Sequence, residues 1–488
     1  MIAYLLPMVI YLVLMILIGF AFSKKQGSVE GFLLGDRSLG SWVVAFSYAF
    51  SGMSGWVLVG YIGVVYLMGP SSFYILIGFN LGFMAGYLLY GKRLRNYSGL
   101  LGAATYTEFF ASRVRSCESL IRIISALSII VFMSAYVASQ LAAIGKTMTV
   151  VFGLSPGALI IIVGVVIALY CLIGGFSAVA FTDFVQGVLI VIGVVALAVV
   201  VVMKAGGPAE ISSIAASMDE NLVNVTMGGK TGMALVGAVI GQLLYGLQCM
   251  GRPHDTIKFF SIKSVKDIKK SLVVCLASLT VTYWAAFAIG YSGRVMFPEL
   301  SDPEQLFAFM VTSDFIPPVL AGVLLTVFLG LMMSTVSSQL LSAGSTIGED
   351  IFHRYVFKDA SEKKVVRITQ IGIVAVAFAG ILFALNSTEN VFNLTVYATS
   401  GLAATYAAVL ALALYWKKLT GPGCFVGMIG GFIICVAWQS AGLDGILISG
   451  VPGIAGSLLL AIVVSLFTKQ KYEDEIATEL ERVKQDIV

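Results

Sequence analysis

The chain has 488 residues; 59% of them are hydrophobic, only 11% are charged, and the mean hydropathy is +0.97. Soluble domains carry about 25% charged residues, so this composition excludes an ordinary soluble protein and indicates one embedded in a lipid bilayer. The formal net charge of +4 is too small to indicate a nucleic-acid partner, and we expect none.

Apolar runs long enough to cross a bilayer recur along the whole chain. A spanning helix needs about 20 mostly apolar residues, and about thirteen runs meet that requirement. They lie near residues 3–22, 40–67, 72–91, 119–152, 156–174, 180–203, 231–250, 271–293, 317–347, 366–386, 390–416, 422–440 and 445–467. The expected fold class is an all-α polytopic membrane protein with about 13 transmembrane helices. The first run lacks a preceding basic residue and a following small-residue cleavage site, which favours a retained helix over a signal peptide.

The second run is interrupted at its centre by the segment FSGMSGW, residues 50–56. Small residues at mid-depth have two interpretations. They let two helices pack closely, or they let a helix unwind so that its free carbonyls bind a cation. This segment alone leaves both open.

The fourth and sixth runs contain the next polar candidates. Tyr136 and Gln140 are neutral and either line a cavity or bond across helices. Asp183 is the main ionisable residue inside an apolar run. An intramembrane acid is a functional candidate, although a carboxylate at a helix start is also favoured by the helix dipole.

The seventh run is interrupted by glycine, glutamine and proline within residues 241–254. It lies five runs after the first interruption, and this spacing predicts an inverted repeat of runs 2–6 and 7–11. Chance is the alternative, because glycine is common in membrane helices. The expected division is a peripheral helix at 1–25, repeats at 26–204 and 205–418, peripheral helices at 419–467, and a cytoplasmic tail at 468–488.

Two adjacent hydroxyl residues, Ser334 and Thr335, lie near the middle of the ninth run. Such hydroxyls often bond to the carbonyl four residues back in the same helix. Facing a broken helix, they would instead supply oxygen ligands to a hard cation.

Lys and Arg residues gather in the loops on one side of the membrane, including Lys24, Lys25, Arg252 and Lys258. The other side holds only Lys146, Lys204, Lys230 and Arg294. The positive-inside rule then predicts an N-terminus outside and a C-terminus in the cytoplasm, which requires an odd number of spans. The charged tail is expected to be a surface amphipathic helix or disordered.

Motifs for catalysis and for ATP hydrolysis are missing. The six cysteines have no paired spacing, and His254 and His353 are far apart and assigned to the cytoplasmic side. No Gly-Lys-Ser/Thr phosphate loop follows the apolar runs. We therefore expect neither an enzyme nor an ATP-driven pump.

Several short motifs together resemble the sodium/solute symporter family, most closely its bacterial sodium/proline branch. They are LGDRSLG at 34–40, MSGW at 53–56, RIISAL at 122–127, GGF at 174–176 with Thr182-Asp183, Gly251 with Pro253-His254, MST at 333–335 with QLL at 339–341, and Glu349-Asp350. Their order and spacing cover nearly the whole chain. The resemblance implies a LeuT-like five-plus-five inverted-repeat fold in a bacterial inner membrane, with sodium as the coupling ion.

The resemblance also assigns roles by position. Sodium would be bound by the carbonyls of Phe50, Met53 and Leu331 and the hydroxyls of Ser334 and Thr335, with Asp183 on its exit route. The substrate would be bound by Ser54, Gly55, Tyr245, Cys249 and Pro253, and we add Tyr136 and Gln140 from the fourth run.

Two departures from the family pattern affect the expected function. Gly52 stands where the proline symporter has an aspartate, and Tyr245 and Cys249 stand where it has tryptophan and tyrosine. We expect sodium-coupled symport of a small organic solute by alternating access, with proline as the first candidate. The alternatives are another amino acid, a monocarboxylate such as pantothenate, or a sensor that retains the fold without coupled transport. An intramembrane enzyme is a weaker alternative.

Overall fold

The computed structural model describes residues 2–23, 28–387 and 389–485, so the predicted loop residues Lys24 and Lys25 lie outside the described residues. The described chain is helical, and its one β contact is an isolated bridge between Leu39 and Ile262. The helices of the first half are α1 (Ile2–Ser23), α2 (Val29–Leu34), α3 (Ser41–Met53), α4 (Gly60–Met68), α5 (Phe73–Gly86), α6 (Lys92–Leu100), α7 (Tyr106–Val114), α8 (Glu118–Phe152), α9 (Pro156–Lys204) and α10 (Pro208–Met218). Those of the second half are α11 (Gly232–Leu243), α12 (Pro253–Ser261), α13 (Val265–Met296), α14 (Leu306–Val311), α15 (Pro318–Ser345), α16 (Glu362–Asn386), α17 (Val391–Tyr415), α18 (Gly421–Ser440), α19 (Gly450–Phe467) and α20 (Glu473–Gln485).

Eleven helices in the described part of the chain are long and apolar enough to cross a membrane. The sequence estimate of about thirteen is higher because it counts two further apolar runs, 40–67 and 156–174, as complete spans. The run at 40–67 is divided at Ser54, and Pro156–Leu169 forms a shorter apolar part of α9. In α9 the chain bends at Gly175, whose φ of 55° and ψ of −167° are not helical. A positive φ at this position favours glycine, which has no Cβ.

The first predicted interruption is a broken helix. Helix α3 ends at Met53 because Ser54 has φ 56° and ψ 174°, and a 3-10 turn, η2 (Gly55–Leu58), follows. The Ser54 hydroxyl accepts a hydrogen bond from the Trp56 backbone amide at 3.2 Å, which caps this turn. Close packing is present as well, since a Cβ at position 55 would lie 1.8 Å from Sδ of Met332. Both interpretations of this segment therefore describe part of what it does.

The second predicted interruption is also a break. A 3-10 turn, η6 (Leu244–Cys249), is followed by an extended Met250 and by Gly251 with φ 72°. Helix α12 then begins at Pro253, whose missing N–H suits the first position of a helix. The backbone amide of Leu39 donates to the Ser261 carbonyl at 3.1 Å, so the start of α3 is joined to the end of α12.

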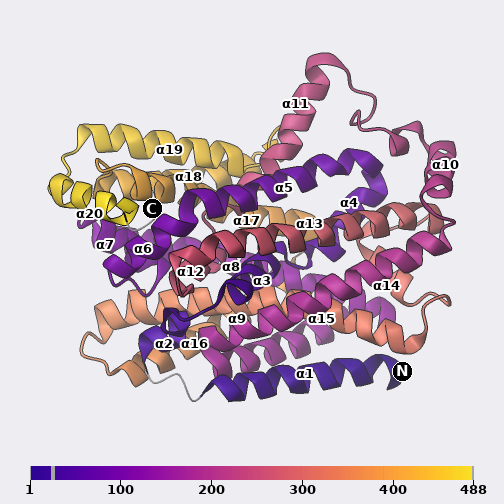
Figure 1. Cartoon of the computed structure of the whole chain (residues 1–488), viewed down its shortest axis with the longest axis horizontal. Helices are drawn as coiled ribbons and strands as arrows, with labels where there is room; N and C mark the ends of the chain where they lie inside the picture. The colour runs from indigo at the N-terminus through magenta and orange to yellow at the C-terminus, as the bar shows by residue number, and fades with distance from the viewer. Residues whose placement is uncertain (1, 24–27, 388, 486–488) are drawn as a thin grey trace.

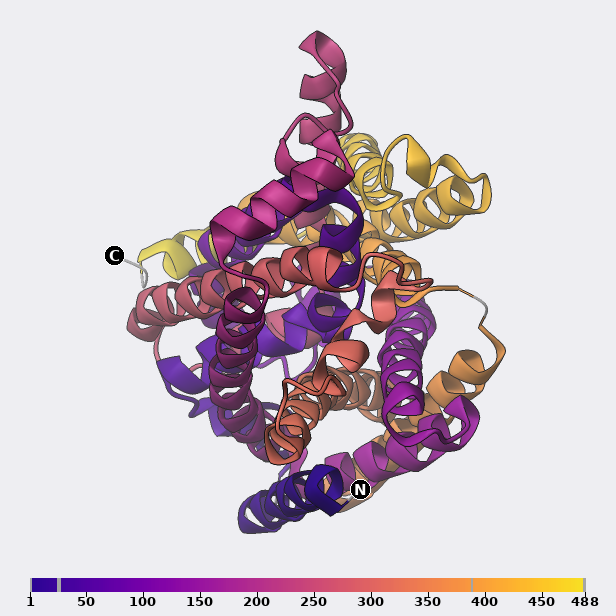
Figure 2. The same ribbon diagram turned by 90° about the vertical axis from the view of Figure 1, so that its right-hand side faces the viewer.

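The long helices run side by side in one bundle (Figure 1), which is seen from one end in Figure 2. The broken helices lie inside it: α3 packs against α9, α13 and α15, and α12 packs against α3, α6 and α15. Helix α1 packs on α9 and α15 at one edge, while α18 and α19 pack on each other and on α17 at another. The C-terminal α20 is the amphipathic helix expected for the tail, with Ile476, Leu480 and Val483 buried. The two breaks thus meet in the interior of the bundle.

Candidate functional site

Four oxygen atoms meet where α15 passes the break in α3. The Ser334 hydroxyl lies 3.4 Å from the carbonyl oxygen of Phe50 and 3.0 Å from that of Leu331. The Thr335 hydroxyl lies 3.3 Å from both carbonyl oxygens. All four residues are buried, and Met53 ends α3 one turn after Phe50. Oxygen is the ligand type that hard cations such as sodium require, so these residues fit the predicted ion.

Asp183 lies near this oxygen cluster, between α3 and α15. Its Oδ2 accepts hydrogen bonds from the Ser47 hydroxyl at 2.6 Å and from the Ser338 hydroxyl at 3.4 Å. The carboxyl group is fully buried, and its Oδ1 has no hydrogen-bond partner among the described residues. Asp183 is therefore an interior group connected to both helices that carry the candidate sodium ligands.

Four of the predicted substrate residues come together at the first break. The Gly55 backbone amide donates to Oε1 of Gln140 at 2.7 Å, which fixes η2 against α8. The Tyr136 hydroxyl interacts with the Ser54 side chain, and its ring lies 5.6 Å from the ring of His254. Polar groups of α8 thus face the break in α3 at Ser54 and Gly55, the arrangement expected of a solute-binding site between discontinuous membrane helices.

The remaining predicted substrate residues divide between two places. Cys249 is fully buried, and Pro253 follows it at the start of α12. Tyr245 is partly exposed and lines a cavity of about 850 Å³ together with Phe392. The rings of Tyr245 and Trp56 lie 6.2 Å and 5.8 Å from that of Phe392. Tyr245 therefore borders this cavity, which we call the outer cavity. The rings of Tyr245, Phe392 and Trp56 form a row from the cavity to the break.

The sequence interpretation placed Arg252 and Lys258 in an exposed loop, with His254 on the same side of the membrane; the loop assignment was wrong, because α12 and the residue before it are buried in the bundle. All three side chains are at most 1% exposed, as is that of Asp255. Arg252 pairs with Asp255 at 2.6 Å between Nη2 and Oδ2. The spacing of charged residues at 252, 255 and 258 was the available signal, because residues three apart share one face of a helix. The positive-inside rule does not detect this spacing, because it counts the charges between apolar runs and not the helix face on which they lie.

The packing around Gly52 leaves no room for a larger side chain. Nη2 of Arg252 donates to the Gly52 carbonyl at 3.3 Å. A Cβ at position 52 would lie 2.7 Å from Nη2 of Arg252 and 2.9 Å from the ring of Phe83. The guanidinium group therefore fills the space that a larger side chain at position 52 would need.

Comparison with known proteins gives consistent results. The model of the "Sodium:solute symporter family" matches residues 32–431. The high-affinity proline transporter PutP of Bacillus subtilis is 32% identical over 461 residues, which are 93% of this chain and 96% of that protein. A sodium/proline symporter of Staphylococcus aureus is 33% identical over 494 residues, covering 98% and 95%.

Solved structures share the fold. A Na⁺-coupled sialic acid symporter in an outward-open state has a TM-score of 0.80 at 20% identity, with 96% of this chain and 98% of that chain covered. The transporter Mhp1 in a closed conformation has a TM-score of 0.56 at 14% identity, covering 91% and 98%. The predicted LeuT-like inverted-repeat fold is thereby confirmed. The chain belongs to the sodium:solute symporter family: it is a membrane-embedded transporter of a small solute and not an enzyme, and sodium is its coupling ion.

Proposed function

We propose that this protein uses an inward sodium gradient to take up proline, or a small amino acid of similar size, by alternating access. The observation that carries the site assignment is the cluster of hydroxyl and carbonyl oxygens of Phe50, Leu331, Ser334 and Thr335. It lies at the break in α3, next to the group of polar contacts formed by Ser54, Gly55, Tyr136 and Gln140. The relatives named as proline transporters supply the substrate.

The proposed cycle begins with sodium between α3 and α15. The ion would replace the two direct hydroxyl-to-carbonyl contacts of Phe50 by ion–oxygen contacts, with Met53 supplying a further carbonyl. This would hold α3 at a fixed distance from α15 and fix the position of Ser54 and Gly55 for the substrate. Because the ion and the substrate share the same broken helix, each would raise the affinity for the other.

Release completes the proposed cycle. Ser338 follows Ser334 by one turn on α15, and its hydroxyl lies 3.4 Å from Oδ2 of Asp183 on α9. We therefore assign Asp183 to the sodium exit route. On the opposite side, Trp56, Phe392 and Tyr245 would close the pocket toward the outer cavity, where Tyr245 meets the arriving solute. Cys249 and Pro253 would line the substrate pocket from the second break.

We further propose the topology that the charge distribution predicts. The two inverted repeats would be residues 26–204 and 205–418, with the N-terminus outside and the C-terminus in the cytoplasm. The membrane would be the bacterial inner (cell) membrane, since the relatives are bacterial proteins.

Uptake of labelled proline into liposomes containing the purified protein tests the proposed function. An inward sodium gradient would be compared with a matched potassium gradient and with an inward proton gradient. We expect accumulation with sodium and none with potassium. Accumulation driven by protons alone would contradict the assigned ion. Sodium-driven uptake of other amino acids or of monocarboxylates, with none of proline, would contradict the assigned substrate.

A further inference from the structure

Two acidic and two strongly basic side chains form a buried cluster with His254 beside the proposed sodium site. The four are Arg252, Asp255, Lys258 and Asp183, and each is at most 1% exposed. Arg252 and Asp255 are directly paired. Lys258 and Asp183 are the remaining base and acid, and burial of either one as an uncompensated charge would be costly.

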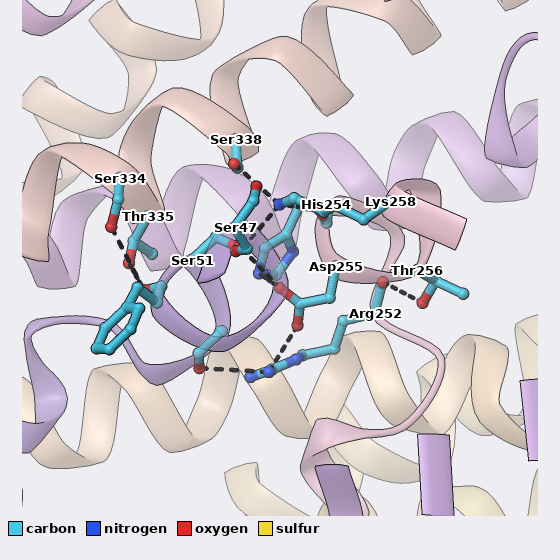
Figure 3. A network of polar contacts seen from close by, with 12 residues as sticks. Ser47, Ser51, Arg252, His254, Asp255, Thr256, Lys258, Ser334, Thr335 and Ser338 are labelled. Carbon is cyan, nitrogen blue, oxygen red and sulfur yellow. Dashed lines mark hydrogen bonds and ion pairs between the residues drawn. The ribbon is translucent and has the colours of Figure 1, made fainter. Parts of the chain in front are cut away.

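The amino group of Lys258 is surrounded by neutral oxygen atoms. Its Nζ donates to the Ser51 hydroxyl at 2.7 Å, to the Ser338 hydroxyl at 3.0 Å and to the His254 carbonyl at 2.6 Å. Three acceptors match the three N–H donors of an ammonium group. They belong to α3, α15 and α12, so one ammonium group joins three helices (Figure 3).

Asp183 is connected to this ammonium group through a single hydroxyl. Ser338 accepts from Lys258 and can donate its own proton to Oδ2 of Asp183, 3.4 Å away. The Ser47 hydroxyl donates to the same Oδ2. Oδ1 of Asp183 has no hydrogen-bond partner among the described residues. The negative charge of Asp183 therefore depends on Lys258 for its nearby compensation.

The ammonium group lies next to the proposed sodium site in the chain as well as in space. Ser51 follows Phe50 directly, and Ser338 is one helical turn after Ser334 on α15 (Figure 3). Ammonium and sodium would therefore connect the same two helices at successive levels. Two hydroxyls, a carbonyl and a nearby carboxylate are also a ligand set that would suit a free hard cation.

We propose that the Lys258 ammonium group is a tethered cation that occupies the position of a second sodium ion and so removes one sodium from the coupling stoichiometry. The tether restricts its movement, because the ammonium is carried on α12 and cannot leave with the substrate. Lys258 is thereby a residue that determines the number of transported ions. This inference deepens the proposed function, because it concerns the neighbour of the proposed sodium site.

Equilibrium binding of ²²Na⁺ to the purified full-length protein in lipid nanodiscs tests this inference. Lys258→Met keeps most of the side-chain volume and removes the charge, which leaves the serine and carbonyl oxygens and Asp183 facing a vacated cation position. We expect the variant to bind one more sodium ion per molecule than the wild type, with a steeper dependence on sodium concentration. The double variant Lys258→Met with Asp183→Asn should return to the wild-type number, because the carboxylate that attracts the extra ion is gone.

Lys146→Met is the matched control. Lys146 also bonds to acidic partners, Asp302 at 2.9 Å and Glu304 at 2.6 Å, but on a different part of the bundle. It should bind the wild-type number of ions. The inference is overturned if Lys258→Met binds the same number of sodium ions as the wild type, or if folded Lys258→Gln does so where the methionine variant does not fold. The wild-type number itself tests the proposed sodium site separately, since only the difference between variants concerns Lys258.

Discussion

The proposed sodium ligands Phe50, Ser334 and Thr335 are uncharged. Their oxygens are buried and lie close together between α3 and α15, and the Phe50 carbonyl oxygen accepts a long hydrogen bond of 3.4 Å from the Ser54 amide at the end of α3. A sodium ion bound there would exchange its water for fixed oxygens, and the loss of even one would weaken binding.

Replacement of both hydroxyls by Ser334→Ala and Thr335→Ala should remove sodium-dependent uptake. A hydrogen bond to a charged group contributes about 1.5–3 kcal/mol; if each hydroxyl–sodium contact contributes a similar amount, the loss of two should lower sodium affinity by about two orders of magnitude or more. Sodium activation of uptake in proteoliposomes measures this. Ser345→Ala is the control, because that hydroxyl bonds only within its own helix to Ser342. Equal sodium activation in the double variant and the wild type would refute the site assignment.

Gly52 lies where Arg252 and Phe83 leave no room for a side chain. Gly52→Ala should displace the guanidinium of Arg252 or the ring of Phe83, because its Cβ would lie within 3 Å of both. Overpacking of this kind costs about 1–3 kcal/mol, so we expect a lower thermal midpoint together with lower uptake. Gly237→Ala on α11 has no atom within 4 Å of its Cβ and should leave the midpoint unchanged. A fully stable and active Gly52→Ala protein would show that this contact is not required.

At the scale of elements, the second break is held by glycines on its partner helix. A Cβ on Gly82 of α5 would lie 1.9 Å from the carbonyl oxygen of Gly246 in η6, and one on Gly246 would lie 1.8 Å from that of Gly78. These contacts are with backbone atoms, so no change of side-chain rotamer relieves them. Backbone approach of this kind is what small residues permit in membrane helices.

Gly82→Ala should therefore separate α5 from η6 and lower the stability of the folded protein by about 3 kcal/mol. The readout is the thermal midpoint in detergent, followed by size-exclusion chromatography. Gly241→Ala in the neighbouring α11 serves as the comparison, since open space surrounds its Cβ. If both variants have the thermal midpoint of the wild type, the close approach of α5 and η6 is not essential for stability.

The short helix α12 carries more of the interior chemistry than its length suggests. Asp255 and Lys258 lie within it and Arg252 immediately precedes it. Helical spacing by threes brings these charges to one face, toward α3 and α15. Its amphipathic pattern resembles that of a surface helix, which explains why charge counting assigned it to a loop.

For the whole molecule, α20 connects the end of the chain to its first third. Arg115 pairs with Glu475 at 2.5 Å and also with Glu479, and the Tyr97 hydroxyl donates to Glu479 at 2.9 Å. Since the tail is thereby docked on α6 and α7, it marks one side of the membrane.

Cysteine labelling can test the proposed orientation. We expect an impermeant maleimide to label Glu220→Cys in right-side-out vesicles and Glu481→Cys only in inside-out vesicles, with the six native cysteines replaced by serine. Both positions are exposed and lie outside the candidate membrane spans, and the side chain of Glu481 is 66% exposed. The reverse pattern would contradict the orientation derived from the positive-inside rule.

Much of the fold was predictable because the bilayer restricts the choices. Backbone groups in hydrocarbon must be paired, so long apolar runs become helices, and the breaks at 50–56 and 241–254 are visible as small or polar residues in such runs. The candidate ligands Ser334 and Thr335 followed from these breaks and the family resemblance. The number of spans was less certain, because a helix can stop at Ser54 or continue through a bend at Gly175 without losing its apolar character.

Hydropathy and local motifs are properties of neighbouring residues, and they were enough to predict that this chain spans a membrane, where its helices break and to which family it belongs. The interior positions of Arg252, Asp255 and Lys258, and the guanidinium group packed against Gly52, could be found only from the packed helices. Burial and charge pairing depend on helices that are far apart in the chain, such as α3, α12 and α15. A sequence does not show whether a charged side chain faces water or an oxygen-lined interior. The packing of the helices distinguishes these two environments.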